Sequence, residues 1–172
     1  MKKWDLSDYS NAELLELYAD ILDELQNRGV THSTNNPIAN YAEKLAQEAL
    51  RLELMPESTK GYDAVDLEGK RYEIKGRRPT AKNSSRQLSM LRGLDKKQFD
   101  YLVGIIFHEN FRVQKGCVIP HHVVLARSRY TTHANAWIFI LNDDVWHIDG
   151  VRDITKELKS KQDGQQVVGA DR

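Results

Sequence analysis

The alternation of apolar and polar positions along this chain is most regular between Gly61 and Arg78. Residues Tyr62–Asp66 and Lys70–Gly76 each alternate with a period of two, which is typical of half-buried strands. Gly69 lies between the two runs. The stretch therefore predicts a β-hairpin whose loop is Leu67-Glu68-Gly69, with the glycine in the left-handed position of a three-residue loop.

This loop determines which residues oppose one another in the hairpin. Counting outward from it pairs Asp63 with Glu73, and opposed side chains lie on the same face of the sheet. Lys75 shares the face of Glu73 because successive side chains alternate. The same count gives the pairs Asp66–Lys70 and Ala64–Tyr72. The opposite face, which should be buried, carries Ala64, Tyr72 and Ile74.

Two carboxylates opposed across a hairpin repel each other, so a purely structural hairpin should avoid them. A divalent cation between them removes this objection, because Mg²⁺ is commonly bound by one or two carboxylates together with water and phosphate oxygens. A neighbouring lysine can then orient or deprotonate a water, or offset charge on a pentavalent phosphate. The alternative is a solvated hairpin face that carries these three charges by chance, and the spacing alone does not decide between the two.

The spacing of these residues also resembles a known family motif. Asp63, followed after nine residues by Glu73-Ile74-Lys75 on a second strand, resembles the motif of the PD-(D/E)xK nuclease superfamily, which has the restriction-endonuclease-like fold. The proline of that motif is absent, since Tyr62 precedes Asp63. The resemblance covers residues 36–107 best. It implies a Mg²⁺-dependent endonuclease that hydrolyses phosphodiester bonds in DNA, such as a restriction-type enzyme.

The resemblance also implies roles for individual residues. Asp63 and Glu73 would bind Mg²⁺ or Mn²⁺, together with the main-chain carbonyl of Ile74. Lys75 would position or activate the attacking water. In this superfamily the helix before the hairpin often supplies a further acid, and Glu43 in the sequence N-Y-A-E-K-L-A matches that acid. An ordinary exposed helical glutamate is the alternative for Glu43.

Two amphipathic helices are predicted before the hairpin. Ser10 and Glu13 form a capping-box pattern at the start of the first helix. Asn36 and Pro37 begin the second helix, which should end near Leu52. The first helix is expected to be an accessory packing or dimerisation element. Its apolar stripe consists of Leu14, Tyr18, Ile21, Leu22 and Leu25.

The chain after the hairpin alternates between apolar runs and polar turns. The most apolar run, Phe99–Phe107, predicts a central strand that is buried on both faces. A short helical pattern starts at Gln87 and reaches Leu94. Further helices are predicted over Pro120–Arg129 and Asp153–Lys159. Further strands are predicted over Phe111–Ile119, Ala136–Leu141 and Val145–Ile148.

Together these elements predict an α/β (α+β) protein with a restriction-endonuclease-like mixed central sheet, flanked by helices, and an extra N-terminal helix. Its 172 residues are enough for one domain with a sizeable core. We expect an accessory helix and loop over residues 1–35, the nuclease domain over residues 36–159, and a flexible tail over residues 160–172.

The formal net charge is zero, but the charges are unevenly distributed along the chain. Residues 1–60 carry 11 acidic and 6 basic side chains, a local balance of −5, whereas residues 70–97 carry 10 basic and 2 acidic side chains, a balance of +8. A basic segment beside the hairpin suits a phosphate backbone, and a solvated basic face is the alternative. The residues expected to bind nucleic acid are Arg77, Arg78, Lys82, Arg86 and Arg92.

Several other classes of site and location are disfavoured. Cys117 is the only cysteine, which excludes an intrachain disulfide and a thiolate zinc cluster. No histidine pair has the spacing of a helical metal site. Residues 1–8 lack the apolar core of a signal peptide, and no apolar run approaches membrane-spanning length, so a cytoplasmic protein without membrane partners is expected.

The partner expected from these features is DNA, with RNA still open, and a homodimer is compatible with the first helix. Two other functions remain open on the same fold. One is a module that binds nucleic acid without cleaving it. The other is an interaction protein that uses the first helix as its docking surface and needs no metal.

Overall fold

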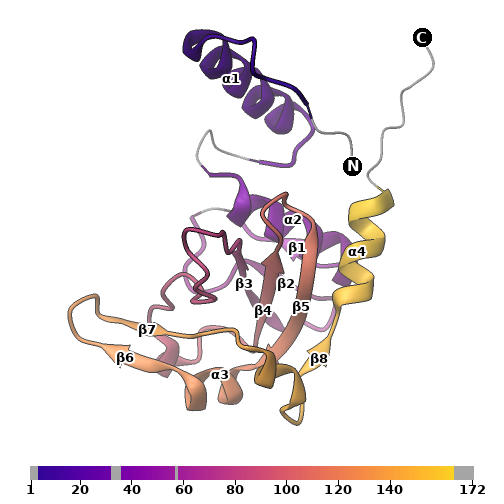
Figure 1. Ribbon diagram of the computed structural model, residues 1–172. Coiled ribbons are helices and arrows are strands. Elements are labelled where there is room, and N and C mark those ends of the chain that lie inside the picture. Colours follow the sequence, from indigo (N-terminus) through magenta and orange to yellow (C-terminus); the bar gives the residue numbers. More distant parts are fainter. Residues whose placement is uncertain (1–3, 32–35, 57, 165–172) are drawn as a thin grey trace.

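The computed structural model describes residues 4–31, 36–56 and 58–164, and a six-stranded mixed sheet lies at its centre (Figure 1). The strand order is β1-β2-β3-β4-β5-β8, with β3 and β4 parallel and the other neighbours antiparallel. These strands are β1 Glu53–Leu54, β2 Ala64–Val65, β3 Arg71–Arg77, β4 Tyr101–Phe107, β5 Val113–Pro120 and β8 Arg152–Asp153. A separate two-stranded sheet consists of β6 Arg129–Thr131 and β7 Ala136–Ile138. The predicted mixed α+β class is therefore confirmed.

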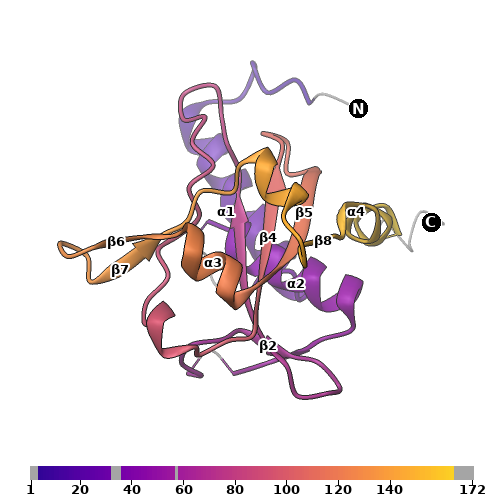
Figure 2. The same ribbon diagram turned by 90° about the horizontal axis from the view of Figure 1, so that it is seen from below.

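Helices and irregular segments cover both faces of the central sheet (Figure 2). The helices are α1 Asn11–Asn27, α2 Ile38–Leu50, α3 His121–Arg127 and α4 Thr155–Gly164, with 3₁₀ turns at Leu94–Lys96 and Asp143–His147. On one face, α2 and α4 bury Tyr72, Ile74 and Ile105. On the other, α3 and the segment containing Leu88 bury Leu102 and Ile106. Among the described residues, no helix is both long and apolar enough to cross a bilayer.

The hairpin of β2 and β3 has the predicted register between Ala64 and Tyr72, but the predicted Asp63–Glu73 pair lies beyond the ladder, where the N–H of Asp63 donates to the carbonyl of Tyr72. Ala64 pairs with Tyr72, and the N–H of Asp66 donates to the carbonyl of Lys70. Gly69 has φ +75°, as its place in the loop requires, and its N–H donates to the carbonyl of Asp66. Ala64 and Tyr72 are buried against α2, so the alternation correctly assigned the two faces.

The Asp66 carboxylate stabilises the hairpin loop. Its Oδ1 accepts hydrogen bonds from the N–H groups of Glu68 and Lys70, each at 2.9 Å, and its Oδ2 accepts one from the Tyr72 hydroxyl at 3.0 Å. Burial opposes ionisation of Asp66, but these hydrogen bonds outweigh burial and hold its pKa below the ordinary value. The group therefore stabilises the fold above its unfolded-state pKa, and this contribution is lost as the pH falls through the folded-state pKa.

We expect Asp66→Ala to lower the free energy of unfolding by about 1–2 kcal/mol at pH 7, because three donors lose a charged acceptor. The difference from the wild type should shrink as the pH falls below about 4. Urea unfolding at several pH values measures both effects. Glu68→Ala, an exposed change in the same loop, serves as the control and should stay within about 0.5 kcal/mol of the wild type. A pH-independent difference would contradict the assignment to the carboxylate.

The capping box predicted for the first helix is confirmed, whereas the second helix begins at Ile38 with Pro37, rather than Asn36, in the cap position. The Ser10 hydroxyl accepts from the N–H of Glu13, and the Glu13 carboxylate accepts from the N–H of Ser10. In α2 the side chain of Asn36 accepts from the N–H of Ile38 at 3.1 Å, and the helix ends at Leu50, two residues before the predicted end.

Helix α1 packs less than its apolar stripe predicted. Within the stripe Leu22 is buried and Leu14 and Leu25 are half-buried, but Tyr18 and Ile21 are 52% and 49% exposed. Figure 1 shows α1 apart from the central sheet, beyond the N-terminal end of α2. The amphipathic pattern therefore produced a helix whose apolar face is only partly covered.

Later elements also differ from the sequence prediction. The helix predicted from Gln87 to Leu94 is wrong, because this segment is extended and only its last residue begins a 3₁₀ turn. Its leucines recur at intervals of three and are buried, but their N–H groups bond to other segments: those of Leu88 and Leu91 donate to the carbonyls of Phe139 and Trp137. Pairing with a distant strand replaced the local helix.

The C-terminal elements are also displaced from their predicted places. The strand predicted over Val145–Ile148 is instead the 3₁₀ turn Asp143–His147, and Ala136–Leu141 is a strand only as far as Ile138. Helix α4 continues through Gly164, five residues into the predicted tail. The reason is Gln162, which is buried and bonds to the Tyr41 hydroxyl on α2. Residues 165–172 lie outside the described part of the chain.

Candidate active site

Three charged side chains converge where β3 extends beyond its partner β2. The Nζ of Lys75 lies 2.6 Å from Oε1 of Glu73 and 3.6 Å from Oδ2 of Asp63. The side chains of Lys75, Glu73 and Asp63 are only 19%, 15% and 28% exposed. The structure thus gathers the three residues that the hairpin register predicted to share a face, in a partly desolvated position.

Asp63 is positioned by the strand that it joins. Its Oδ2 accepts a hydrogen bond from the N–H of Ile74 at 2.7 Å, so the carboxylate replaces a strand partner at the point where β2 pairing ends. In an extended strand the N–H and C=O of one residue point to the same edge. The Ile74 carbonyl therefore faces the same edge as the Asp63 carboxylate.

Glu43 of α2 is the fourth predicted site residue, and it lies between two hollows at this edge. One hollow, of about 790 Å³, is lined by Glu43 and Asp63 together with residues of β1 and the following loop. The other, of about 560 Å³, is lined by Glu43 and Lys75 together with residues 83–90. The carboxylate of Glu43 is close enough to raise the pKa of Lys75. The helix before the hairpin thus brings an acid to the same place.

The pKa values of Glu73 and Lys75 both lie above their ordinary values, but for different reasons. Burial raises the pKa of Glu73, and the charge of Asp63 adds to this rise although Lys75 opposes it. Burial lowers the pKa of Lys75, but the negative charges of Glu73 and Asp63 outweigh burial, so that pKa lies above its ordinary value. Lys75 is therefore an ammonium group at neutral pH in this arrangement, and it can donate hydrogen bonds but not accept a proton.

The oxygen atoms at this edge fit a hydrated divalent cation. Asp63 and Glu73 supply carboxylates, and the Ile74 carbonyl faces the same way. Mg²⁺ needs only one or two carboxylates when water and substrate phosphate oxygens complete its coordination. Within the described ranges no cluster of three or more His, Cys, Asp or Glu side chains is arranged to hold a metal. A cation here would therefore depend on main-chain, water and substrate oxygens.

No protein-family model matches this chain, and no curated protein matches its sequence.

The five basic residues predicted to bind nucleic acid do not form one free surface. Arg77 lines the hollow that contains Lys75, but its guanidinium donates to the carbonyl of Ser85 and the side chain of Asn83. Arg86 forms an ion pair with Asp143 at 3.0 Å. Two other members, Lys82 and Arg92, are exposed, and Arg92 lines a separate hollow.

Of these five basic residues, Arg78 makes contacts that stabilise the fold. Its Nη1 donates to the carbonyl of Glu109 at 2.7 Å, and its guanidinium lies 4.4 Å from the centre of the Phe111 ring. The Glu109 carboxylate accepts from the N–H of Ala81 in the same loop. These contacts hold the loop after β3 against the β4–β5 turn.

We expect Arg78→Ala to lower the free energy of unfolding by about 1–2 kcal/mol, because it removes a hydrogen bond and a cation–π contact. The slope of log affinity for DNA against log salt should stay unchanged. Lys82→Ala is the matched change in the same exposed loop, and it should leave stability unchanged but reduce that slope by about 0.9 if Lys82 contacts a phosphate of duplex DNA. Fluorescence anisotropy titrations at several salt concentrations measure the slope. The reverse result would make Arg78 the phosphate ligand.

The structure adds polar residues to the site that the sequence left without a role. Gln87 and Ser89 line the same hollow as Lys75, beside Asn83 and Ser85. The predicted helix over this segment gave no reason to place Gln87 and Ser89 at the site. The segment lies beside β3 because its backbone pairs with residues 137–140. The absence of acidic residues from Ile74 to Leu94 was the one sequence signal that pointed to this segment.

His121 has a structural role. His121 is buried, its Nε2 lies 2.7 Å from the carbonyl oxygen of Leu94, and its ring meets Phe99 edge-on. It links the start of α3 to the 3₁₀ turn that begins at Leu94.

Proposed function

We propose that this protein is a metal-dependent endonuclease that hydrolyses phosphodiester bonds in DNA, with a restriction-endonuclease-like fold. The observation that carries the proposal is the meeting of Asp63, Glu73 and Lys75 at an uncovered strand edge. A structural hairpin has no need to bury two carboxylates so close together, and perturbed ionisable groups in a hollow are typical of functional sites.

Each residue of the site has a chemical task in this proposal. Asp63 and Glu73, with the Ile74 carbonyl, bind Mg²⁺ or Mn²⁺, which when bound supplies Lewis-acid polarisation of the phosphate and a water of lowered pKa. Lys75, as an ammonium group, donates hydrogen bonds to the attacking water or to the oxygens on which negative charge develops. Glu43 provides a further acid beside them.

The hollow that contains Lys75 suits the phosphate backbone on chemical grounds. Positive charge comes from Lys75 and Arg77, and neutral donors come from Asn83, Ser85 and Gln87. Charged and neutral donors in combination are the usual partners of phosphate oxygens. The strand would therefore lie along the segment that follows β3.

The decisive experiment is incubation of the purified protein with supercoiled plasmid in Mn²⁺ or Mg²⁺, followed by gel electrophoresis. We expect nicked or linear plasmid with the wild type and none in EDTA. Glu73→Gln, which keeps the shape of the side chain and removes its charge, is the control against a contaminating nuclease. Equal cleavage by wild type and Glu73→Gln would refute the proposal.

One observation favours the interaction-protein alternative, namely the exposed apolar side chains Leu15, Tyr18 and Ile21 on α1. Such a protein would need no cation at β3. Titration calorimetry with Mn²⁺ separates the two functions. A heat of Mn²⁺ binding that the wild type shows and Asp63→Asn does not would support the nuclease, whereas a wild type that binds no Mn²⁺ would support the alternative.

A further inference from the structure

The two-stranded sheet β6–β7 forms an arm that projects away from the central sheet, as Figures 1 and 2 both show. A hollow of about 590 Å³ lies against this arm, a volume in the range of pockets that bind nucleotide-sized ligands. We call it the arm hollow. Residues that line it include Arg92, Lys96, Gln98, Tyr130, Asn135 and Trp137.

The arm hollow contains an aromatic surface that is both exposed and fixed. Tyr130 is 44% exposed, although its hydroxyl donates to Oδ1 of Asn135 at 2.7 Å. Its ring meets Trp137 edge-on, with 5.3 Å between the ring centres. A single exposed tyrosine needs no explanation. Tyr130 is different, because the Asn135 amide and the Trp137 indole hold its ring in place while much of the side chain stays exposed. Such a ring can stack against a flat ligand.

The charges around this surface favour an anionic ligand. Arg92 and Lys96 line the arm hollow together with one carboxylate, that of Asp95. Both cationic side chains are exposed, and a guanidinium plane can itself stack on a base. A base linked to a phosphate fits the combination of aromatic face, amides and cations better than a free apolar ligand does.

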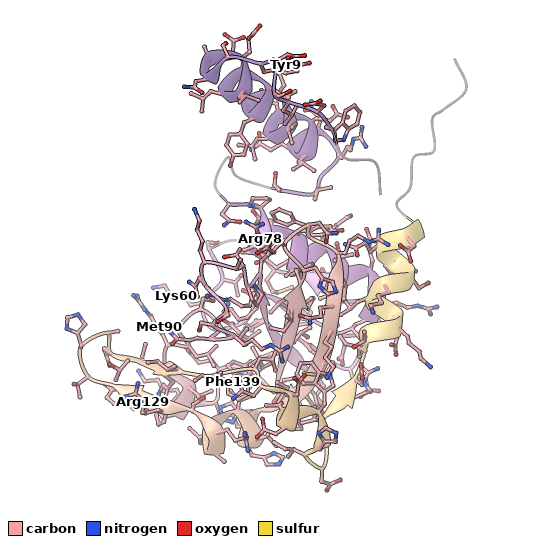
Figure 3. All side chains as sticks on the ribbon, viewed as in Figure 1. Tyr9, Lys60, Arg78, Met90, Arg129 and Phe139 are labelled. Carbon is pink, nitrogen blue, oxygen red and sulfur yellow. The ribbon has the colours of Figure 1, made fainter. Side chains whose placement is uncertain are left out.

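The arm hollow and the candidate active site are joined by one stretch of chain. Gln87, Ser89 and Met90 line the hollow that contains Lys75, and Arg92 lines the arm hollow. Hydrogen bonds between Leu91 and Trp137 tie this stretch to β7. In Figure 3, Met90 lies on the same side of the view as Arg129 at the start of the arm.

The chain between the two hollows is short. Met90 lines the hollow that contains Lys75, Arg92 lines the arm hollow, and two residues of extended chain cover at most about 7 Å. The nearest walls of the two hollows are therefore close enough for one nucleic-acid strand to enter both.

We infer that the arm hollow binds an unpaired nucleobase of the strand whose phosphate lies at Lys75, by stacking on Tyr130. The inference rests on the proposed nuclease function for the position of the strand. Stacking accepts any base, because every base has a π-face, so the arm contributes affinity and register without sequence readout. The ligand class is accordingly single-stranded DNA or a locally unpaired segment.

The test is binding of a fluorescent single-stranded DNA 12-mer in EDTA, where no cleavage occurs. Tyr130→Ala should weaken binding about tenfold to a hundredfold, the usual loss for one stacked base. The salt slope should stay unchanged, because no charge is removed. Tyr130→Phe should bind like the wild type. Tyr9→Ala, another exposed tyrosine outside the arm, is the matched control and should have no effect.

A second measurement uses the unaltered protein and does not depend on the folding of a variant. A DNA strand with 5-iodouracil at one position at a time should photo-crosslink to Tyr130 or Trp137 from a single narrow window of positions. Crosslinks that are absent from the arm, or wild-type affinity of Tyr130→Ala, would overturn the inference.

The two proposals fail in different ways. A protein that cleaves plasmid with Mn²⁺ while Tyr130→Ala binds DNA normally would overturn the arm hollow alone. Tyr130-dependent binding without any cleavage would support the arm hollow and refute the nuclease. A wild type that binds no DNA would overturn both.

Discussion

Replacing Lys75 with alanine is expected to lower the rate of DNA cleavage about 100-fold to 1,000-fold while DNA affinity stays nearly unchanged. Lys75 is the ammonium group placed 2.6 Å from Glu73, and the charge of that pair is buried. A donor that acts on charge developing in the transition state contributes about 2.7–4 kcal/mol, which is the source of this range. Single-turnover cleavage with saturating Mg²⁺ measures the rate, and anisotropy in EDTA measures the affinity.

The control for this prediction is Lys70→Ala, which removes an exposed lysine from the same hairpin and should cleave at the wild-type rate. Without a cation, Lys75→Ala leaves Asp63 and Glu73 facing each other without their shared counter-charge, so its thermal stability in EDTA should fall. Mg²⁺ should restore part of that loss. Wild-type cleavage by Lys75→Ala would make Lys75 a structural counter-ion and refute the mechanism.

Asp63→Asn is expected to abolish the thermal stabilisation that Mg²⁺ or Mn²⁺ gives the wild type. A ligand at 100 times its dissociation constant stabilises a protein by about 2.7 kcal/mol, which corresponds to a rise in Tm of roughly 5–10 °C for a chain of this size. The variant loses one of two carboxylate ligands, so its shift should be close to zero. Differential scanning fluorimetry across a metal titration measures both proteins.

In the absence of metal the same substitution has a smaller effect. The sequence alone suggests that Asp63→Asn would be neutral or mildly stabilising, because it relieves repulsion from Glu73. The structure changes this expectation, since Oδ2 of Asp63 accepts from the N–H of Ile74 and lies 3.6 Å from the Lys75 ammonium. We now expect a loss of about 1 kcal/mol or less. Glu68→Gln, exposed on the same hairpin, is the control, and equal metal shifts in wild type and Asp63→Asn would refute the metal site.

What the sequence determined here are the features that depend on neighbours along the chain. Alternation with a period of two, together with one glycine at a loop position, was enough to pair Ala64 with Tyr72 and to place Glu73 and Lys75 on one face. The capping box of α1 was predictable for the same reason, because its two residues lie only three positions apart. The continuous apolar run gave β4 its central place.

Only the tertiary structure decided what distant segments do to one another. The leucines of residues 88–94 fit a helix locally, yet their backbone bonds to β7 and the residues after it, because pairing with a remote strand outweighed a weak helical preference. The contacts of Arg78 with Glu109 and Phe111 likewise join segments that are distant along the chain. The place of Glu43, between hollows that contain Asp63 and Lys75, depends on how α2 crosses the sheet. Sequence spacing fixes which face of an element a side chain occupies, whereas the partners it meets depend on the packing of elements that the chain brings together from far apart.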